Sequence, residues 1–221
     1  MNINKYKEIL YECEKYGAQL LAVSKTQPPD KIQALFDLGQ RHFGENKVQE
    51  IESKREKLPT EINWHLIGHL QSNKVKFIAP YVSLIHSVDS LKLLTEMNKQ
   101  AEKCSRVIEG LLQIFIATEE TKFGLNQEEA LALLHSTEFR QMKNVRIVGL
   151  MGMASNTSDE KQVRNEFKKL KSLFEELRLH NIPNYNSKTL SMGMSHDYRI
   201  ALEEGSNMIR VGSMIFGDRK T

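Results

Sequence analysis

Short apolar runs alternate with longer amphipathic segments along almost the whole chain. Apolar runs of about four to eight residues are typical of buried strands, whereas apolar residues spaced three and four positions apart are typical of helices. The alternation therefore predicts strand and helix in regular succession. We predict eight strands, near Leu20–Ser24, Arg41–Phe43, Trp64–Ile67, Leu84–His86, Leu111–Ala117, Val145–Leu150, Thr189–Met192 and Met208–Val211.

Helices are predicted between these strands from their apolar spacing and from residues typical of helix starts. A leading helix is expected before the first strand, because Tyr6, Ile9 and Cys13 are close to helical spacing. The predicted helices with recognisable bounds are Met1–Tyr16, Lys31–Leu38 after Pro28, Pro29 and Asp30, Leu91–Lys103 after Ser90, Glu160–Leu179 after Asp159, and His196–Glu204.

This succession of elements predicts an α/β fold. Strict alternation of strand and helix argues for a parallel sheet, and eight repeats argue for closure into a (β/α)8 barrel with an extra N-terminal helix. An open, doubly wound sheet is the alternative. No linker, low-complexity tract or break in composition divides the chain, so we expect one domain over residues 1–221.

The composition narrows the class of ligand. The chain is 40% hydrophobic and 27% charged, and its 31 basic and 28 acidic residues form no basic stripe of the kind that nucleic acid requires. It shows no secretory signal and no apolar run long enough to span a bilayer. Cys13 and Cys104 form no C-x-x-C pair and are expected to be reduced thiols. We therefore expect a cytoplasmic protein with a small anionic ligand and with neither a nucleic-acid nor a membrane partner.

Lys25 directly follows the first predicted strand, in the string AVSKTQP. At the rim of a buried strand, desolvation disfavours the ammonium form of a lysine and leaves a nucleophilic amine. Such a lysine can form an imine with a carbonyl ligand. The alternative is a strand-end lysine whose amine simply reaches water.

The last two predicted strands run into loops that suit an anion. Ser195 lies in SMGMSHD, where the next helix is expected to begin, and is either an N-cap or part of a phosphate site. Gly212 and Ser213 follow the eighth strand, where backbone amides can approach a phosphate without interference from a Cβ atom. Because barrels commonly bind phosphate with these two loops, we predict a phosphorylated ligand.

Arg210 is placed at the end of the eighth strand, where an unpaired guanidinium would be costly to bury. One interpretation is an ion pair with a nearby acid such as Glu45. The other is a donor to the ring nitrogen of a bound cofactor. Because arginine keeps its proton, a pyridine nitrogen facing it stays unprotonated, and the cofactor is a weaker electron sink.

An imine-forming lysine, a phosphate site and an arginine for a ring nitrogen together describe pyridoxal 5'-phosphate (PLP). The chain also resembles the pyridoxal phosphate homeostasis protein family, which are single-domain relatives of the alanine racemase barrel. The resemblance covers the chain from residue 22 almost to its end. It rests on the strings AVSKTQP, HFGENKVQE, WHLIGHLQSNK, IHSVDS, EETKFGL, GLMGM, LSMGMSHD and IRVGSMIFGDR.

The resemblance implies a role for each candidate residue. The Schiff-base lysine corresponds to Lys25, the phosphate site to Ser195, Gly212 and Ser213, and the pyridine-nitrogen partner to Arg210. Asn46 and Met153 are implied to line the cofactor, and His69 to lie near its rim.

Two of these assignments have alternatives, and one neighbouring position departs from the family pattern. From the residues alone, Asn46 could instead be a helix cap and Met153 could fill the core. The family usually has an aromatic residue where this chain has Lys47, which puts a stacking role at that position in doubt.

Two further features concern additional sites. Lys122, in EETKFG, could bind cofactor at a secondary, looser site, or could be a solvated loop lysine after two glutamates. The histidines, among them His65, His86, His135 and His180, include no H-x-x-x-H pair on a predicted helix. We therefore predict no metal site.

Two functions from different classes fit these residues. The protein either holds PLP on Lys25 as a carrier and buffer, or is a PLP-dependent amino-acid racemase or related enzyme of low activity. In the racemase pattern, a second domain supplies the opposing acid-base tyrosine and the dimer contact, and we expect no such domain here. A barrel that binds another phosphorylated metabolite without covalent attachment is a third class. We therefore expect a monomeric, non-enzymatic PLP homeostasis protein with no catalytic residues and with apo PLP-dependent enzymes as recipients.

Overall fold

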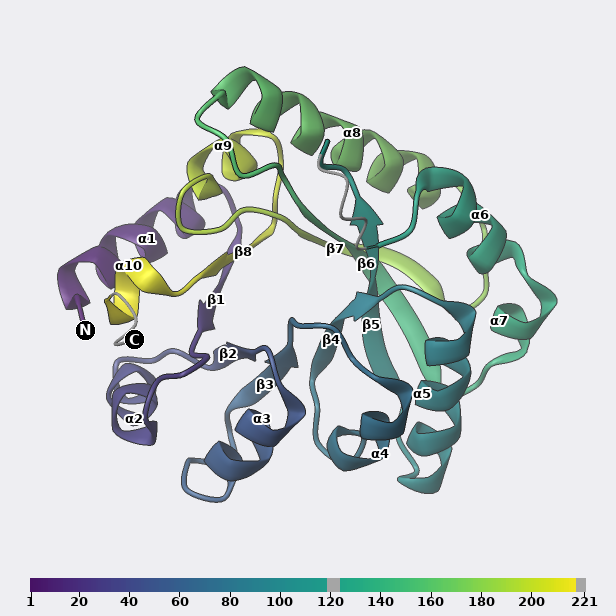
Figure 1. Cartoon of the computed structure of the whole chain (residues 1–221), viewed down its shortest axis with the longest axis horizontal. Helices are drawn as coiled ribbons and strands as arrows, with labels where there is room; N and C mark the ends of the chain where they lie inside the picture. The colour runs from purple at the N-terminus through teal and green to yellow at the C-terminus, as the bar shows by residue number, and fades with distance from the viewer. Residues whose placement is uncertain (119–123, 218–221) are drawn as a thin grey trace.

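The computed structural model of the chain describes residues 1–118 and 124–217. Eight parallel strands close into a barrel in chain order, and β8 pairs with β1 (Figure 1). This closure confirms the predicted (β/α)8 barrel and excludes the open sheet. The strands are β1 (Gln19–Val23), β2 (His42–Glu45), β3 (Asn63–Leu66), β4 (Leu84–Val88), β5 (Ile108–Phe115), β6 (Val145–Met153), β7 (Tyr185–Ser191) and β8 (Met208–Val211).

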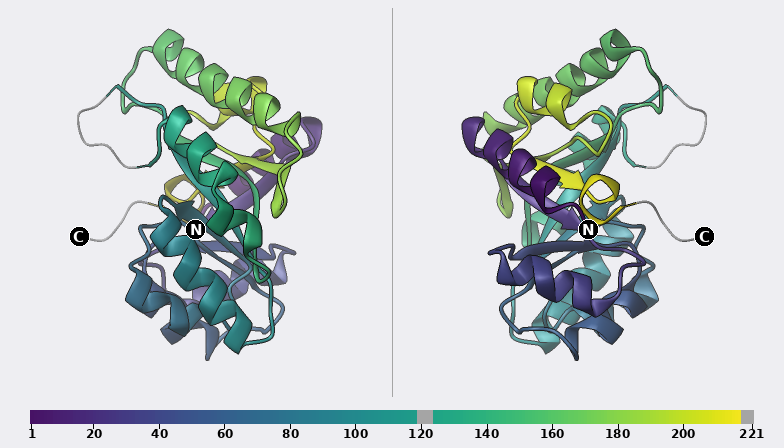
Figure 2. Two further views of the ribbon diagram at one scale, coloured as in Figure 1. Left: turned by 90° about the vertical axis from the view of Figure 1, so that its right-hand side faces the viewer. Right: turned by 90° about the vertical axis from the view of Figure 1, so that its left-hand side faces the viewer.

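Helices cover the outside of the barrel. Figure 2 shows the long α8 on one side of the molecule and the helices α3 to α5 on the opposite side. The helices are α1 (Ile3–Lys15), α2 (Pro29–Asp37), α3 (Val48–Arg55), α4 (Val75–Ile78, after the 3-10 turn Ser72–Lys74), α5 (Leu91–Lys103), α6 (Gln127–His135), α7 (Thr137–Gln141), α8 (Glu160–Arg178), α9 (Tyr198–Glu203) and α10 (Ser213–Phe216).

Local sequence explains where several helices begin. The Ser90 hydroxyl accepts the N–H of Leu93 at the start of α5, and the Asp159 carboxylate accepts the N–H of Lys161 at the start of α8. Pro29 occupies the first position of α2, where its missing N–H costs nothing. These residues satisfy or remove orphan donors, which is why the predicted starts are found close to their expected places.

Two separate apolar cores stabilise the barrel. The larger core lies between the strands and the helices and contains large buried side chains such as Phe43, Phe139 and Phe167. The smaller core fills the barrel interior. Because the interior is packed with side chains, a ligand site of this fold lies at the carboxyl ends of the strands. The inner core consists of Leu21, Leu84, Leu111, Val148, Met151 and Met208.

The extra N-terminal helix α1 packs beside α10, next to the end of β8 (Figure 1). The N–H of Asn2 donates to the carbonyl oxygen of Ile215 over 2.7 Å. On the other side, Arg199 of α9 forms ion pairs with Glu8 and Glu12 of α1. The extra helix therefore holds together the two short helices that follow β7 and β8.

Strands β6 and β7 differ in extent from the prediction. Strand β6 continues to Met153, because β5 provides a pairing partner as far as Phe115. Strand β7 begins at Tyr185, which pairs with Ile147 of β6, and ends at Ser191. Residues 186–189 are all polar, which concealed the early part of this strand from an analysis based on apolar runs.

Helix α9 begins two residues later than predicted, at Tyr198. The Asp197 carboxylate accepts the N–H of Met194 and closes a turn over residues 195–197. This turn keeps Ser195 outside the helix, which matters for the site described below.

Two features bear on the expected cellular environment. Cys13 and Cys104 are free thiols, and Cys13 is buried. None of the helices in residues 1–118 and 124–217 combines the length and the apolar character needed to cross a bilayer.

Gly149 offers a test of the barrel register. Between Gly110 and Leu112 of β5, strand β6 carries one extra residue, and Gly149 adopts φ +147° at this bulge. A Cβ atom there would collide with the backbone of Thr189 in β7. We expect Gly149→Ala to lower the free energy of unfolding by about 3 kcal/mol in urea denaturation.

Gly39 provides the matched control for this substitution. It also has a positive φ, +100°, but a Cβ atom added at that position would have no neighbouring atom within 4 Å. Gly39→Ala is therefore expected to cost only about 1 kcal/mol, which is the strain of the backbone conformation alone. Equal losses in the two variants would show that the close approach of β6 to β7 is not a constraint.

Candidate functional site

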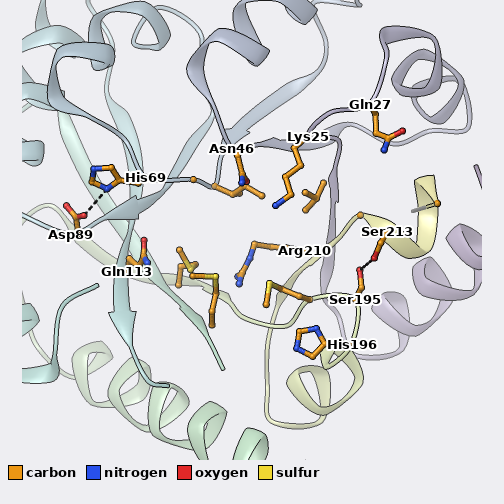
Figure 3. A pocket seen from close by; sticks show the side chains of 18 residues that line it. Lys25, Gln27, Asn46, His69, Asp89, Gln113, Ser195, His196, Arg210 and Ser213 are labelled. Atoms are coloured by element: carbon orange, nitrogen blue, oxygen red, sulfur yellow. Dashed lines mark hydrogen bonds and ion pairs between the residues drawn. The ribbon is translucent and has the colours of Figure 1, made fainter. Parts of the chain in front are cut away.

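A pocket of about 540 Å³ opens at the carboxyl ends of the barrel strands. It brings together all seven residues that the sequence singled out for cofactor binding, although they are spread over most of the chain. Figure 3 shows the Lys25 amine and the Arg210 guanidinium pointing into the same space. The seven residues are Lys25, Asn46, Met153, Ser195, Arg210, Gly212 and Ser213.

Lys25 is half-buried in a tight turn immediately after β1. The N–H of Ser24 donates to Gly44 of β2 over 3.0 Å, and the N–H of Gln27 donates back to Ser24. Thr26 adopts φ +65°, a left-handed conformation that is costly for a β-branched residue. Such strain persists only where the surroundings hold it in place.

A buried ionic cluster holds this turn from below. The Lys54 ammonium on α3 donates to the Ser24 carbonyl oxygen over 2.9 Å and to Glu45 over 2.8 Å. It also pairs with Glu50, which in turn accepts the N–H of Thr26 over 2.8 Å. The cluster therefore satisfies the backbone on both sides of Lys25.

Glu45 is the most deeply buried member of this cluster. Its Oε1 accepts the Ser24 hydroxyl over 2.6 Å as well as the Lys54 ammonium. Burial raises the pKa of Glu45 to about 7, and Lys54 and Ser24 act in the opposite direction. The sequence did not reveal this cluster, because its members come from a strand end and a neighbouring helix.

Ser195 and Ser213 face one another across the loops that follow β7 and β8. The Ser213 hydroxyl donates to the Ser195 oxygen over 3.1 Å (Figure 3). The N-cap of α9 is Asp197, so the interpretation of Ser195 as an N-cap is wrong. A Cβ atom on Gly212 would lie 2.8 Å from the Val23 carbonyl oxygen, so only glycine allows β8 to turn here.

Arg210 is 4% exposed and extends from β8 beneath the pocket. Its Nη1 donates to both the carbonyl and hydroxyl oxygens of Ser191 over 2.8 Å, and its Nη2 donates to the Gly152 carbonyl over 3.0 Å. A guanidinium has five N–H donors, and these bonds use three of them. Among the bonds within the described part of the chain, the Nε–H and one Nη2–H can still donate to another partner.

The alternative interpretation of Arg210, an ion pair with Glu45, is wrong. Glu45 is engaged by Lys54 and Ser24, whereas Arg210 donates to Ser191 and Gly152. Burial lowers the pKa of Arg210 to about 10, and the charge of Asp197 partly opposes this. The guanidinium therefore remains a cation and an obligate donor at neutral pH.

Asn46 and Met153 are both pocket residues. Helix α3 has Lys47 at its N-cap, so Asn46 is not the helix cap that was considered. A Cβ atom on Gly68 would collide with the Asn46 backbone, which shows how closely the ends of β2 and β3 approach each other. Met153 is 40% exposed, so it does not fill the core.

His69 lines the rim of the same pocket and forms a pair with Asp89 over 3.4 Å (Figure 3). Asp89 was not singled out from the sequence, and neither were the lining residues Gln27 and Gln113. Each lies within four residues of the carboxyl end of a strand, which is the signal that could have found them.

Two sequence predictions concern sites elsewhere. Lys122 lies outside the described residues. Among residues 1–118 and 124–217, no three His, Cys, Asp or Glu side chains are arranged to hold a metal ion.

The polar groups of the pocket suit one kind of ligand. An amine, two hydroxyl groups beside a glycine turn, and a buried cationic donor surround a single space. The hydroxyl groups and nearby amides favour a phosphate, the guanidinium favours an aromatic nitrogen acceptor, and the amine can attack a carbonyl. The residues present therefore fit PLP, which carries all three groups.

Lys54 tests the support of the Lys25 turn. Lys54→Met would leave Glu45 buried without its cation, and breaking a buried pair in this way costs about 3 kcal/mol. We expect that loss in urea denaturation, together with faster amide hydrogen exchange around Thr26. Lys57→Met, at an exposed position just after the same helix, is the control and should change neither quantity.

Comparisons with known proteins show the family of this chain. The family model described as "Alanine racemase, N-terminal domain" matches residues 2–220. The pyridoxal phosphate homeostasis protein of Aquifex aeolicus (strain VF5) is 40% identical to the chain, over 94% of this chain and 92% of the relative.

Solved structures show the same architecture. The structure of PipY of Synechococcus elongatus PCC7942 with PLP bound has a TM-score of 0.82 and 35% identity, covering 91% of this chain and 93% of PipY. An alanine racemase of Clostridium difficile 630, 13% identical with a TM-score of 0.75, matches over 57% of its own length and shares the fold alone. On these grounds the chain belongs to the pyridoxal phosphate homeostasis protein family, built on the alanine racemase N-terminal barrel.

Proposed function

We propose that this protein binds PLP as a Schiff base on Lys25 and acts as a carrier and buffer in intracellular PLP homeostasis. The observation that carries the proposal is the convergence of Lys25, Arg210 and the Ser195–Ser213 pair on one pocket. The relative PipY, whose barrel superposes on this one, has been solved with PLP bound. A PLP-buffering role fits the name given to relatives that are about 40% identical.

In this proposal each group has one task. Lys25 provides the amine that forms the imine, and its strained turn keeps that amine at the pocket rim. Ser195, Ser213 and the backbone at Gly212 bind the phosphate, and Arg210 donates to the pyridine nitrogen. Asn46 and Met153 line the ring. When bound, the cofactor supplies an electrophilic aldehyde and an electron-withdrawing ring.

The same arrangement favours storage over catalysis. Arg210 keeps its proton, so a ring nitrogen that accepts from it remains neutral and withdraws electrons less strongly. The pocket opens to solvent at the strand ends, where cofactor can enter and leave. We propose that a monomer in the cytoplasm hands PLP to apo PLP-dependent enzymes.

An amino-acid racemase or related enzyme of low activity is the second candidate. The observation in its favour is the shared barrel, which also occurs in alanine racemase and in a D-threonine aldolase of Filomicrobium marinum. Both are below 25% identical to this chain, so the likeness concerns the fold alone.

The first test is the absorption spectrum of the purified protein with added PLP. We expect a visible imine band, and borohydride reduction followed by peptide mapping should place the cofactor on Lys25. Lys25→Ala should lack the band, whereas Lys57→Ala, which removes an exposed lysine outside the pocket, should keep it. A band of equal strength in Lys25→Ala would contradict the proposal.

A second measurement separates the carrier from the enzyme. PLP-loaded protein is mixed either with an apo PLP-dependent enzyme or with single amino-acid enantiomers. We expect activation of the apo enzyme, and racemisation or elimination no faster than with the same concentration of free PLP. Turnover well above free PLP that Lys25→Ala abolishes would instead support the second candidate.

A further inference from the structure

Three histidines form a row inside the barrel that the proposed function does not use. His42 begins β2, His65 lies in β3 and His86 lies in β4. Nδ1 of His42 lies 3.0 Å from Nε2 of His65, and Nδ1 of His65 lies 2.9 Å from Nε2 of His86. Ring nitrogens that face each other in successive pairs do not converge on one point, so this row is not a metal site.

The row continues across the barrel to the pocket. Nδ1 of His86 lies 3.2 Å from the Ser191 hydroxyl oxygen, at the end of β7. The same oxygen accepts a hydrogen from Nη1 of Arg210 over 2.8 Å. An unbroken series of hydrogen bonds therefore leads from His42, at the amino-terminal end of the barrel, to Arg210 beneath the pocket.

Burial makes these imidazoles neutral. His65 is 3% exposed and His86 is fully buried. Burial, assisted by the neighbouring His42, lowers the pKa of His65 to about 3. Burial also lowers the pKa of His86, with His65 and Arg210 adding to the effect, and it lowers the pKa of His42. Each neutral ring has one N–H donor and one nitrogen acceptor.

Arg210 decides which nitrogen carries the hydrogen in each ring. A guanidinium can only donate, so the Ser191 oxygen accepts from it. The hydroxyl oxygen has a second lone pair, but if it also accepted from His86, its own hydrogen would be buried without an acceptor among the described residues, which is costly. The other partner of this hydroxyl there is His86 Nδ1, which therefore accepts the Ser191 hydrogen. His86 must carry its hydrogen on Nε2 and donate to His65.

The same reasoning passes along the row. His65 accepts at Nδ1, so it carries its hydrogen on Nε2 and donates to Nδ1 of His42. All three imidazoles are then Nε2–H tautomers, and every bond donates away from the cation. Hydrogen bonds aligned in one direction in a poorly polarisable interior reinforce one another.

We propose that His86, supported by His65 and His42, is a positioning residue for Arg210. By taking the Ser191 hydrogen, His86 keeps the lone pairs of that hydroxyl turned toward Nη1 of Arg210. This contact, together with the Ser191 and Gly152 carbonyls, sets the plane of the guanidinium under the pocket. The expected effect of His86 on PLP binding rests on the proposed function, whereas the direction of the hydrogen bonds along the row does not.

The direction of the hydrogen bonds along the histidine row is tested first in the protein without cofactor. Long-range ¹H–¹⁵N correlation spectra distinguish a ring nitrogen that carries hydrogen from one that does not, and we expect Nε2–H tautomers for His42, His65 and His86. Ser191→Ala should release His86 from this preference while keeping the Ser191 carbonyl contact. An Nδ1–H tautomer at His86 in the native protein would overturn the inference.

The effect on Arg210 is tested with a matched pair of variants. His86→Leu fills the space without an acceptor, so we expect PLP binding weakened roughly ten-fold and a shifted cofactor band. His86→Asn places an oxygen close to the position of Nδ1 and should restore most of both properties. Leu84→Ala, which removes bulk from the same strand inside the barrel, controls for general loss of packing.

Each result separates the inference from the proposed function. A native protein that takes up no PLP would refute the proposed function. The tautomers of the three histidines would still show whether the hydrogen bonds run in the inferred direction. If His86→Leu binds PLP as tightly as the native protein and with the same band, the inference fails and the proposed function stands. If His86→Leu does not fold, His86→Asn and Ser191→Ala carry the test, and unchanged tautomers in Ser191→Ala overturn the inference.

Discussion

The need to satisfy the buried guanidinium of Arg210 determines how the polar groups around it in the barrel are arranged. Removing a cation from water is costly, and here the cost is offset by two backbone carbonyls and one hydroxyl of the surrounding strands. No carboxylate accepts directly from it among these bonds, so the site keeps a positive charge and the direction of its donors. The orientation of Ser191, and of the histidines behind it, follows from that charge.

A second buried cluster supports the turn after β1, the strand that neighbours β8. Lys54 joins the end of β1 to β2 through Ser24 and Glu45, and Glu50 holds the strained Thr26. The two clusters surround different groups, because Arg210 presents a permanent donor whereas Lys25 presents the amine that the proposed function uses. The two groups follow separate strands and have separate buried partners around them.

These two clusters explain how one barrel can serve cofactor storage. The closely packed inner core leaves the strand ends as the place for a ligand, and the glycine turn after β8 lines the pocket there. A pocket that opens to solvent permits exchange, and in the proposed function the permanent donor beneath it restrains the reactivity of the ring. Membership of the pyridoxal phosphate homeostasis family is in keeping with this combination.

The amino-acid sequence by itself determined the barrel and the main site residues, because strand and helix periodicity is local and chemistry in this fold occurs where strands end. Lys25, Ser195, Arg210 and Gly212 were found in this way. Tertiary structure alone decided which partners they have. Glu45 pairs with Lys54 instead of Arg210, and His65 and His86, which lie on separate strands, join one row of hydrogen bonds. Such pairings depend on strand register and on contacts across the barrel interior, which no local pattern records.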